Sequence, residues 1–144
     1  MKALSLTQPW AELVVLGEKE WETRSWKTTR RGRIAIHASK KFPKWAKELA
    51  ENDAYYVSTL GKYPITRVVR GAIVGTVEII AMQSTDEIRD FLGRKEIAFG
   101  DYQSERWGWQ LANPVRLSDP IPCRGALGLW EVPPEIVIKL ADLS

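Results

Sequence analysis

The stretch Gly17–Trp26, GEKEWETRSW, concentrates charged and aromatic side chains within ten residues. A strand presents alternate side chains on one face, so an extended Trp21–Trp26 would bring Glu22, Arg24 and Trp26 together. A carboxylate, a guanidinium and an indole on one face can hold a planar polar ligand. The competing interpretation is an edge strand whose ion pair is simply solvated.

The residues before this stretch predict a strand followed by a short helix. Lys2–Leu6 alternates weakly and is expected to form the first strand. Thr7-Gln8-Pro9 favours a helix start, with Thr7 as cap and proline in the first turn. Gly17 is expected to end that helix, because glycine accepts the left-handed conformation found at helix ends. The helix therefore leads the chain directly into the charged stretch.

Length and composition predict one soluble domain, residues 1–144. No apolar run approaches the roughly 20 residues of a membrane span, and the N-terminus lacks the pattern of a secretion signal. Cys123 is the only cysteine, which fits a cytoplasmic location, and one cysteine with one histidine makes a structural zinc site improbable. We expect no metal and no cofactor. The composition does not indicate an oligomeric state.

The net charge of +3 hides a local basic block. Arg24–Lys47 holds nine bases and no acid, whereas the rest of the chain, with twelve bases and eighteen acids, carries −6. Such an asymmetry favours a polyanionic partner at one surface. A lysine-rich solvated face is the alternative. Within the block, Arg33–Ser39 alternates like a half-buried strand and places the sole histidine, His37, on its polar face.

The middle of the chain predicts a helix, a loop and a central strand. Pro43–Asn52 is expected to be helical with Trp45 on its buried side, and Asp53–Val69 to be a loop with at most a short helical turn. Gly71–Met82 is rich in β-branched residues and predicts a central strand. Within it, Gly75 indicates a bulge or a close backbone approach, and the carboxylate of Glu78 needs a partner, for which Arg24 or Lys19 is expected.

The last third predicts short elements. We expect a helix from Ser84 to Leu92, an irregular segment over 93–105, and two strands, Trp107–Leu111 and Val115–Leu117, joined at Asn113-Pro114. Further on, we expect a turn between Pro120 and Pro122, a strand or turn over 124–132, and a terminal helix from Pro133 to about Leu140. Several strands without regular strand–helix alternation predict a small β-barrel with added helices.

Three stretches together resemble a known family. They are SLTQPWA (residues 5–11) with the pattern Gly17-x-Lys19-x-x-Glu22-x-Arg24, then RGRIAIHAS (31–39), and the strand over 71–78 with RGALGLW (124–130). In this combination they resemble the ASCH domain, a relative of the PUA fold, over nearly the whole chain. The resemblance implies an α+β fold: a PUA-like small barrel of five to six mostly antiparallel strands with peripheral short helices.

The resemblance also implies a cleft and a function. The family is associated with binding RNA or other nucleic acids, and Lys19, Glu22 and Arg24 occupy its motif positions. Some relatives resemble metal-independent ribonucleases or amidohydrolases that act on N4-acetylcytidine. The amidohydrolases have a threonine nucleophile three residues after the lysine, where this chain has Glu22. The motif Gln8-Pro9-Trp10 is closer to coactivator-type ASCH domains.

Three functions therefore remain open from the sequence. The first is a domain that binds RNA, another nucleic acid or a nucleotide-like ligand in a basic cleft. The second is an enzyme acting on RNA or a modified nucleoside, with Lys19 and Glu22 as its catalytic residues. The third is a protein-interaction module of transcription or translation that uses exposed tryptophans. The expected ligand-binding residues are Gln8, Trp10, Arg24, Trp26, His37, Ser39, Lys40 and Lys41.

Overall fold

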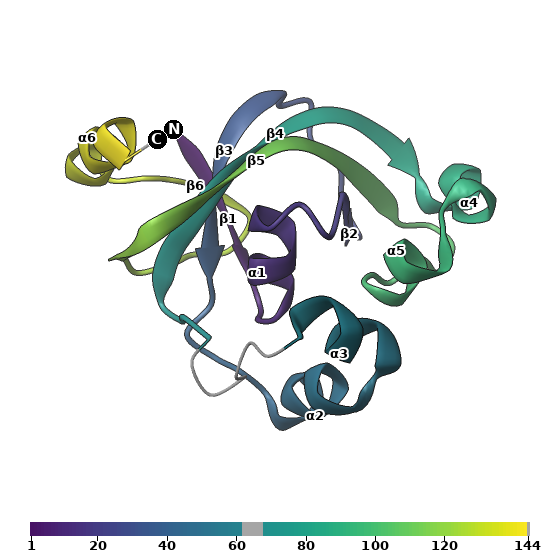
Figure 1. The fold of residues 1–144 in the computed structure, drawn as a ribbon. Helices are drawn as coiled ribbons and strands as arrows, with labels where there is room; N and C mark the ends of the chain where they lie inside the picture. The colour runs from purple at the N-terminus through teal and green to yellow at the C-terminus, as the bar shows by residue number, and fades with distance from the viewer. Residues whose placement is uncertain (62–67, 144) are drawn as a thin grey trace.

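A curled six-stranded sheet organises the chain in this computed structural model, which describes residues 1–61 and 68–143. The strands are β1 (Lys2–Leu6), β2 (Trp21–Arg24), β3 (Gly32–Ala38), β4 (Ala72–Ser84), β5 (Trp107–Pro122) and β6 (Leu129–Glu131). Their order is β2-β5-β4-β3-β1-β6, with β1 parallel to β3 and the other neighbouring pairs antiparallel. The predicted small barrel is confirmed as a half-barrel in which β4 and β5 arch over the first helix (Figure 1).

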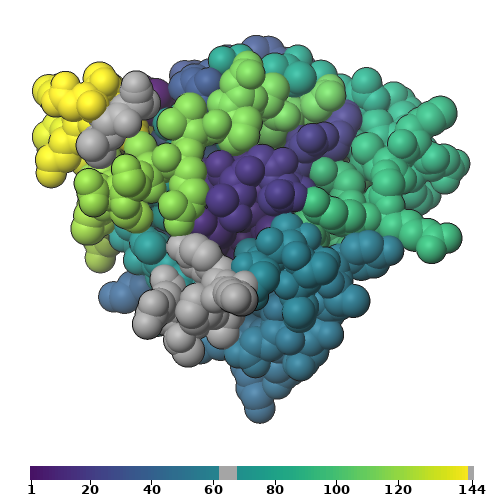
Figure 2. Space-filling model, in the orientation of Figure 1, coloured from purple at the N-terminus to yellow at the C-terminus, as the bar shows by residue number. Residues whose placement is uncertain are grey.

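Short helices surround the sheet. They are α1 (Trp10–Val15), α2 (Lys44–Asn52), α3 (Ala54–Leu60), α4 (Thr85–Ile88), the 3-10 helix η2 (Arg89–Phe91), α5 (Arg94–Ala98) and α6 (Pro134–Leu143). In Figure 1, α1 lies inside the curve of the sheet, α2 and α3 pack below it, and α6 lies near the chain ends. In the space-filling view the purple N-terminal residues are set between the green β5 region and the teal α3 (Figure 2). None of the helices in the described part of the chain is long and apolar enough to cross a membrane.

Both faces of the sheet are covered at β1 and β3, where successive residues point in opposite directions and each direction meets a hydrophobic cluster. Leu4 and Ile36 face inward and pack with Val14 of α1, whereas Ala3 and Ala35 face outward and pack in the cluster that includes Ile136 of α6. β3 is therefore covered on both sides from Ile34 onward. The prediction of a half-buried strand with a polar face was wrong for this reason, and His37 is only 3% exposed.

The predictions made for Gly17 and Gly75 are confirmed, because the backbone at each position excludes or disfavours a side chain. Gly17 has φ +79° and follows α1, and the amides of the next two residues bond the carbonyl of Leu13. At Gly75 the β4–β5 register shifts, and a Cβ there would collide with the Val115 carbonyl and lie 2.6 Å from the Val15 side chain. The close backbone approach predicted at Gly75 is thus confirmed. Thr7, in contrast, makes no side-chain cap: its carbonyl accepts from the amide of Trp10.

Several predicted boundaries were wrong, and in β5 strand pairing overrode the local signals. Residues 107–122 form the single strand β5, in which Asn113 takes φ +50° and Pro122 still pairs with β4. The segment predicted as a loop contains α3, capped by Asp53, and the irregular segment over 93–105 contains α5. Residues 62–67 of that predicted loop lie outside the described residues. The helix predicted after Ser84 is divided between α4 and η2, with Ser84 as its cap.

Candidate functional site

Two adjoining hollows lie beside the C-terminal end of β1. We call them the aromatic hollow, of about 590 Å³, and the basic hollow, of about 850 Å³. Ser5, Thr7 and Arg24 line both. A ligand that fills one hollow can therefore continue into the other.

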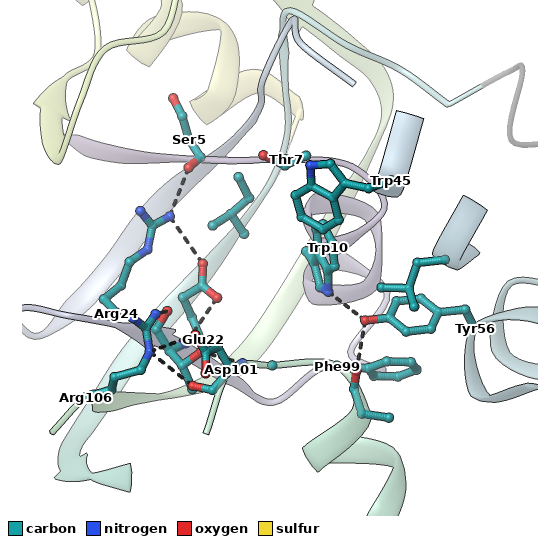
Figure 3. Close-up of a pocket in the computed structure, with 15 residues that line it drawn as sticks. Ser5, Thr7, Trp10, Glu22, Arg24, Trp45, Tyr56, Phe99, Asp101 and Arg106 are labelled. Carbon is teal, nitrogen blue, oxygen red and sulfur yellow. Dashed lines mark hydrogen bonds and ion pairs between the residues drawn. The ribbon is translucent and has the colours of Figure 1, made fainter. Parts of the chain in front are cut away.

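The aromatic hollow has an apolar wall and a polar wall. Its aromatic side chains are Trp10, Trp45, Tyr56 and Phe99, and its charged ones are Glu22, Arg24, Asp101 and Arg106. Figure 3 shows the two groups on opposite sides of the cavity. The aromatic residues come from α1, α2, α3 and the end of α5, and the charged ones from β2 and the segment before β5. Four helices and a sheet edge thus build one slot.

Trp10 is held in place by a chain of hydrogen bonds. Its indole Nε1 donates to the hydroxyl of Tyr56 over 2.9 Å, and that hydroxyl donates to the carbonyl of Ala98 over 2.9 Å. Burial raises the pKa of Tyr56 to about 12, so the hydroxyl stays a donor at neutral pH. Trp45 lies over Trp10, with ring centroids 5.6 Å apart and planes 39° apart, and is 61% exposed.

The polar wall is made of two ion pairs. Arg24 donates from one guanidinium nitrogen to Glu22 over 3.2 Å and to the carbonyl of Ser5 over 3.0 Å. Arg106 lies 3.6 Å from Asp101 and donates to the carbonyl of Thr23 over 3.2 Å. The predicted common face of Glu22 and Arg24 is observed. Because each carboxylate has an arginine partner, the hollow has no unbalanced charge of either sign.

Lys19 lies behind this wall and not in it. Its side chain is 1% exposed and donates to the carbonyl of Phe99 over 2.6 Å, with Glu22 3.9 Å away. Burial lowers the pKa of Lys19, while the nearby carboxylates of Glu22 and Glu96 oppose that shift. The lysine thus supports the segment that forms the floor of the aromatic hollow.

The basic hollow is lined by five bases: Arg24, Lys40, Lys41, Arg70 and Arg124. No aspartate or glutamate is among the described residues that line it. Positive charges with low-dielectric walls and no acid between them concentrate a positive potential. The two hollows therefore differ: one is neutral and aromatic, the other cationic.

His37 holds one wall of the basic hollow. Trp130 Nε1, which can only donate, bonds Ser5 Oγ over 3.1 Å, so the Ser5 hydroxyl is free to donate to His37 Nδ1 over 3.0 Å. The other ring nitrogen then donates to the carbonyl of Cys123 over 2.7 Å. Burial lowers the pKa of His37, although the bond to Cys123 opposes the shift. Gly125 packs so tightly on this ring that a Cβ would lie 2.6 Å from it.

The predicted site residues separate into three groups. Trp10, Glu22 and Arg24 line the aromatic hollow, and His37, Ser39, Lys40 and Lys41 line the basic one together with Arg24. Lys19, Gln8 and Trp26 line neither. Gln8 is fully buried: its side-chain amide donates to the carbonyl of Val69 and accepts from the amide of Glu12. Trp26 packs edge-on against Trp109, with ring centroids 4.9 Å apart.

Sequence reasoning missed several residues of the two hollows. Trp45 was predicted to be core, which was wrong: α2 buries Ala46 and Ala50 but turns the indole toward Trp10. Arg70 and Arg124 lie outside the basic block and were not assigned to the cleft. Asp101 was placed in the irregular segment over 93–105, and Arg106 was assigned to no element and no site. Only the RGALGLW stretch, part of the family resemblance, gave a signal for Arg124.

The basic block itself is dispersed by the fold. Lys27 lies 4.4 Å over the ring of Trp107, and Arg33 pairs with Glu78 at 3.2 Å. The prediction that Arg24 or Lys19 would pair with Glu78 was therefore wrong. β5 separates β2 from β4 in the sheet, whereas β3 is the neighbour of β4 and places Arg33 directly opposite Glu78. Within the described residues, no three His, Cys, Asp or Glu side chains cluster so as to hold a metal ion.

The curled mixed sheet with a helix in its curve is a PUA-like fold. The ASCH domain model matches residues 4–121, and the chain belongs to the ASCH domain family. It is 31% identical to "Activating signal cointegrator 1" of Homo sapiens and of Mus musculus over 143 residues, which is 92% of this chain and 22% of each relative. The chain thus spans about a fifth of those relatives. The crystal structure of ASCH from Zymomonas mobilis has the same fold, with TM-score 0.60 and 16% identity over 99% of this chain and 94% of that one.

Proposed function

We propose that this chain binds RNA or another nucleic acid, with backbone phosphates in the basic hollow. The observation that carries the proposal is the set of five bases lining one hollow without an acid among the described lining residues. Phosphate contacts from Lys and Arg supply most sequence-independent affinity for nucleic acids. Two of the five bases, Arg70 and Arg124, are brought there by the fold from outside the basic block, which supports a built site over a chance cluster.

The site supports a strand better than a single small anion. The basic hollow has about 850 Å³ and continues into a second hollow. Arg24 serves both, and its hydrogen bonds to Glu22 and Ser5 fix the position of its charge. Membership of the ASCH family and similarity to "Activating signal cointegrator 1" support a role in RNA or transcription.

The test is a salt titration of binding. We would measure the anisotropy of a labelled single-stranded RNA and of the matching DNA between about 50 and 200 mM salt. Each phosphate contact contributes a slope of about −0.7 in log affinity against log salt, so about four contacts give a slope near −3. Lys40→Ala with Lys41→Ala should weaken binding and make the slope less steep by about 1.4.

The control variant removes the same number of positive charges at positions away from both hollows. Arg94→Ala with Lys139→Ala removes two exposed bases that line neither hollow. This variant should bind with nearly the wild-type slope. Affinity that is independent of salt, or an equal effect of both double variants, would contradict the proposal. Capture of a protein partner that is insensitive to salt would instead favour an interaction module.

A second candidate function is an enzyme acting on RNA or on N4-acetylcytidine. The observation that favours it is the buried Lys19, whose lowered pKa increases its neutral, basic form, 3.9 Å from Glu22 behind the aromatic hollow. The test is incubation of the pure protein with RNA and with N4-acetylcytidine beside a Lys19→Met variant, which keeps the side-chain length. Turnover that disappears in the variant supports catalysis, and turnover that survives it assigns the activity elsewhere.

A further inference from the structure

We propose that the aromatic hollow receives one unpaired nucleobase, stacked on Trp45, from the strand whose phosphates occupy the basic hollow. The inference rests on the proposed nucleic-acid binding and specifies which part of the ligand each hollow takes. It assigns a binding role to Trp45, which neither the sequence pattern nor the family motifs marked.

The stacking surface is the first argument. Trp45 exposes 61% of its surface, although large aromatic side chains are usually well buried. It is not a loose side chain on a tip: it rests on Trp10, which Tyr56 and Ala98 fix through two hydrogen bonds. An open indole on a rigid support is the kind of platform on which bases stack without regard to sequence.

The facing wall is the second argument. Across the cavity lie Glu22, Arg24, Asp101 and Arg106 (Figure 3). A flat ring stacked on the indole would turn its rim toward these groups. Nucleobases have apolar faces and a rim of donors and acceptors, which this combination of carboxylate oxygens and guanidinium N–H groups can satisfy. A purely apolar ring would make no hydrogen bond to the polar wall.

Charge balance excludes the other common ligand of an aromatic hollow. Aromatic sites that select methylated ammonium groups rely on the attraction of a cation to ring faces. Here both carboxylates are already paired, Glu22 with Arg24 at 3.2 Å and Asp101 with Arg106 at 3.6 Å. The basic hollow next to them would repel a cation further. The site therefore favours a neutral heterocycle attached to an anion.

The junction of the hollows is the third argument. A nucleotide joins its base to its phosphate through one sugar, so its two ends need adjoining sites of different character. Ser5, Thr7 and Arg24 line both hollows and so mark where the sugar would lie. A base in a duplex is stacked and paired and cannot enter such a slot without leaving the helix. The domain should therefore favour single strands, bulges or ends over uninterrupted duplex.

The experiment separates the base from the backbone. Three ligands of equal phosphate number are compared by anisotropy: a single strand, the same strand made of abasic units, and a hairpin whose loop is a linker without bases, so that every base is paired. The wild-type chain should bind the single strand about tenfold or more better than the abasic strand, the effect expected from stacking one base. Trp45→Ala should bring that ratio close to one without changing the salt slope, and Trp45→Phe should keep part of it.

Two controls make the outcomes distinct. Phe91→Ala removes an aromatic side chain that is 87% exposed but lines neither hollow, and it should leave the ratio unchanged. Lys40→Ala with Lys41→Ala should reduce the salt slope and keep the ratio. No binding of any ligand would refute the proposed function itself. Salt-dependent binding with equal affinity for the base-bearing and abasic strands would refute only the role of the aromatic hollow, as would an equal loss of affinity for both in Trp45→Ala.

Discussion

Arg24 donates to Glu22 over 3.2 Å at the place where the aromatic and basic hollows meet. Both residues come from the same short strand, β2, two positions apart. The same guanidinium nitrogen also bonds the carbonyl of Ser5 on β1. One side chain therefore lines both hollows, balances a carboxylate in one of them and links two strands that are not neighbours in the sheet.

Replacing Arg24 should affect both readouts of binding at once. Arg24→Met removes a phosphate contact, so the salt slope should become less steep by about 0.7. It also leaves Glu22 without its arginine, which should reduce the preference for a base-bearing strand. We expect about 1 kcal/mol lower stability, since the pair is partly exposed. Anisotropy and urea unfolding measure these effects, and a change in only one of the two binding readouts would separate the hollows.

Lys19 should make stability depend on pH in the alkaline range. The unfolded lysine titrates near 10.5, whereas burial lowers the pKa of the folded one. Between these values the unfolded chain binds more protons, so the free energy of unfolding should rise with pH. Urea unfolding of the wild type and of Lys19→Met, compared between about pH 7 and 10, isolates this group. A constant difference between the two proteins across that range would show that Lys19 is not destabilised in its charged form.

His37 should make stability depend on pH in the acid range. Its ordinary pKa is 6.5, and burial lowers that value in the folded state. As pH falls below 6.5 the unfolded chain takes up the proton first, so the contribution of neutral His37 is lost progressively. The wild type should therefore lose more stability than His37→Gln between about pH 7 and 5. Thermal unfolding at several pH values tests this, and parallel curves for the two proteins would contradict it.

Gly75 should tolerate no side chain. An added Cβ would collide with the Val115 carbonyl of β5 and press on Val15 of α1. Backbone on one side and a buried side chain on the other leave no direction for relaxation, so Gly75→Ala should cost at least about 2 kcal/mol. Gly93→Ala, where nothing lies within 4 Å, is the matched control and should be nearly neutral. Denaturant midpoints of the two variants would give the comparison.

The sequence predicted the fold best where hydrophobic pattern and backbone requirement agree. β1, the centre of β4 and the close approach at Gly75 could be read directly, because buried β-branched runs and an obligatory glycine leave little freedom. The pairing of β5 could not, since a proline-containing segment such as 107–122 stays in the sheet only because β4 holds it. Local signals at Asn113-Pro114 suggested a break that tertiary contacts override.

The site divided in the same way. The alternation of β2 predicted that Glu22 and Arg24 share a face, because strand geometry sets that relationship locally. The position of Trp45 depends on how α2 packs against α1. Helical spacing alone predicted that Trp45 is buried like its neighbour Ala46, and only Ala46 is. Arg70 and Arg124 reach the basic hollow from 30 or more residues beyond Lys40, a distance in sequence that no local pattern spans.

Gly125 packs closely on His37, so the wall of the basic hollow needs both an early and a late segment of the chain. Residues 123–128 form one side of the basic hollow. They are held by the bond from His37 of β3 to the carbonyl of Cys123, 86 residues apart in sequence, and Gly125 packs on both His37 and Ser5 of β1. A nascent polypeptide has made the pair Glu22 and Arg24 long before it has made Arg124. The basic hollow should thus be complete only after residues 123–128 have been synthesised, well after Lys40, Lys41 and Arg70.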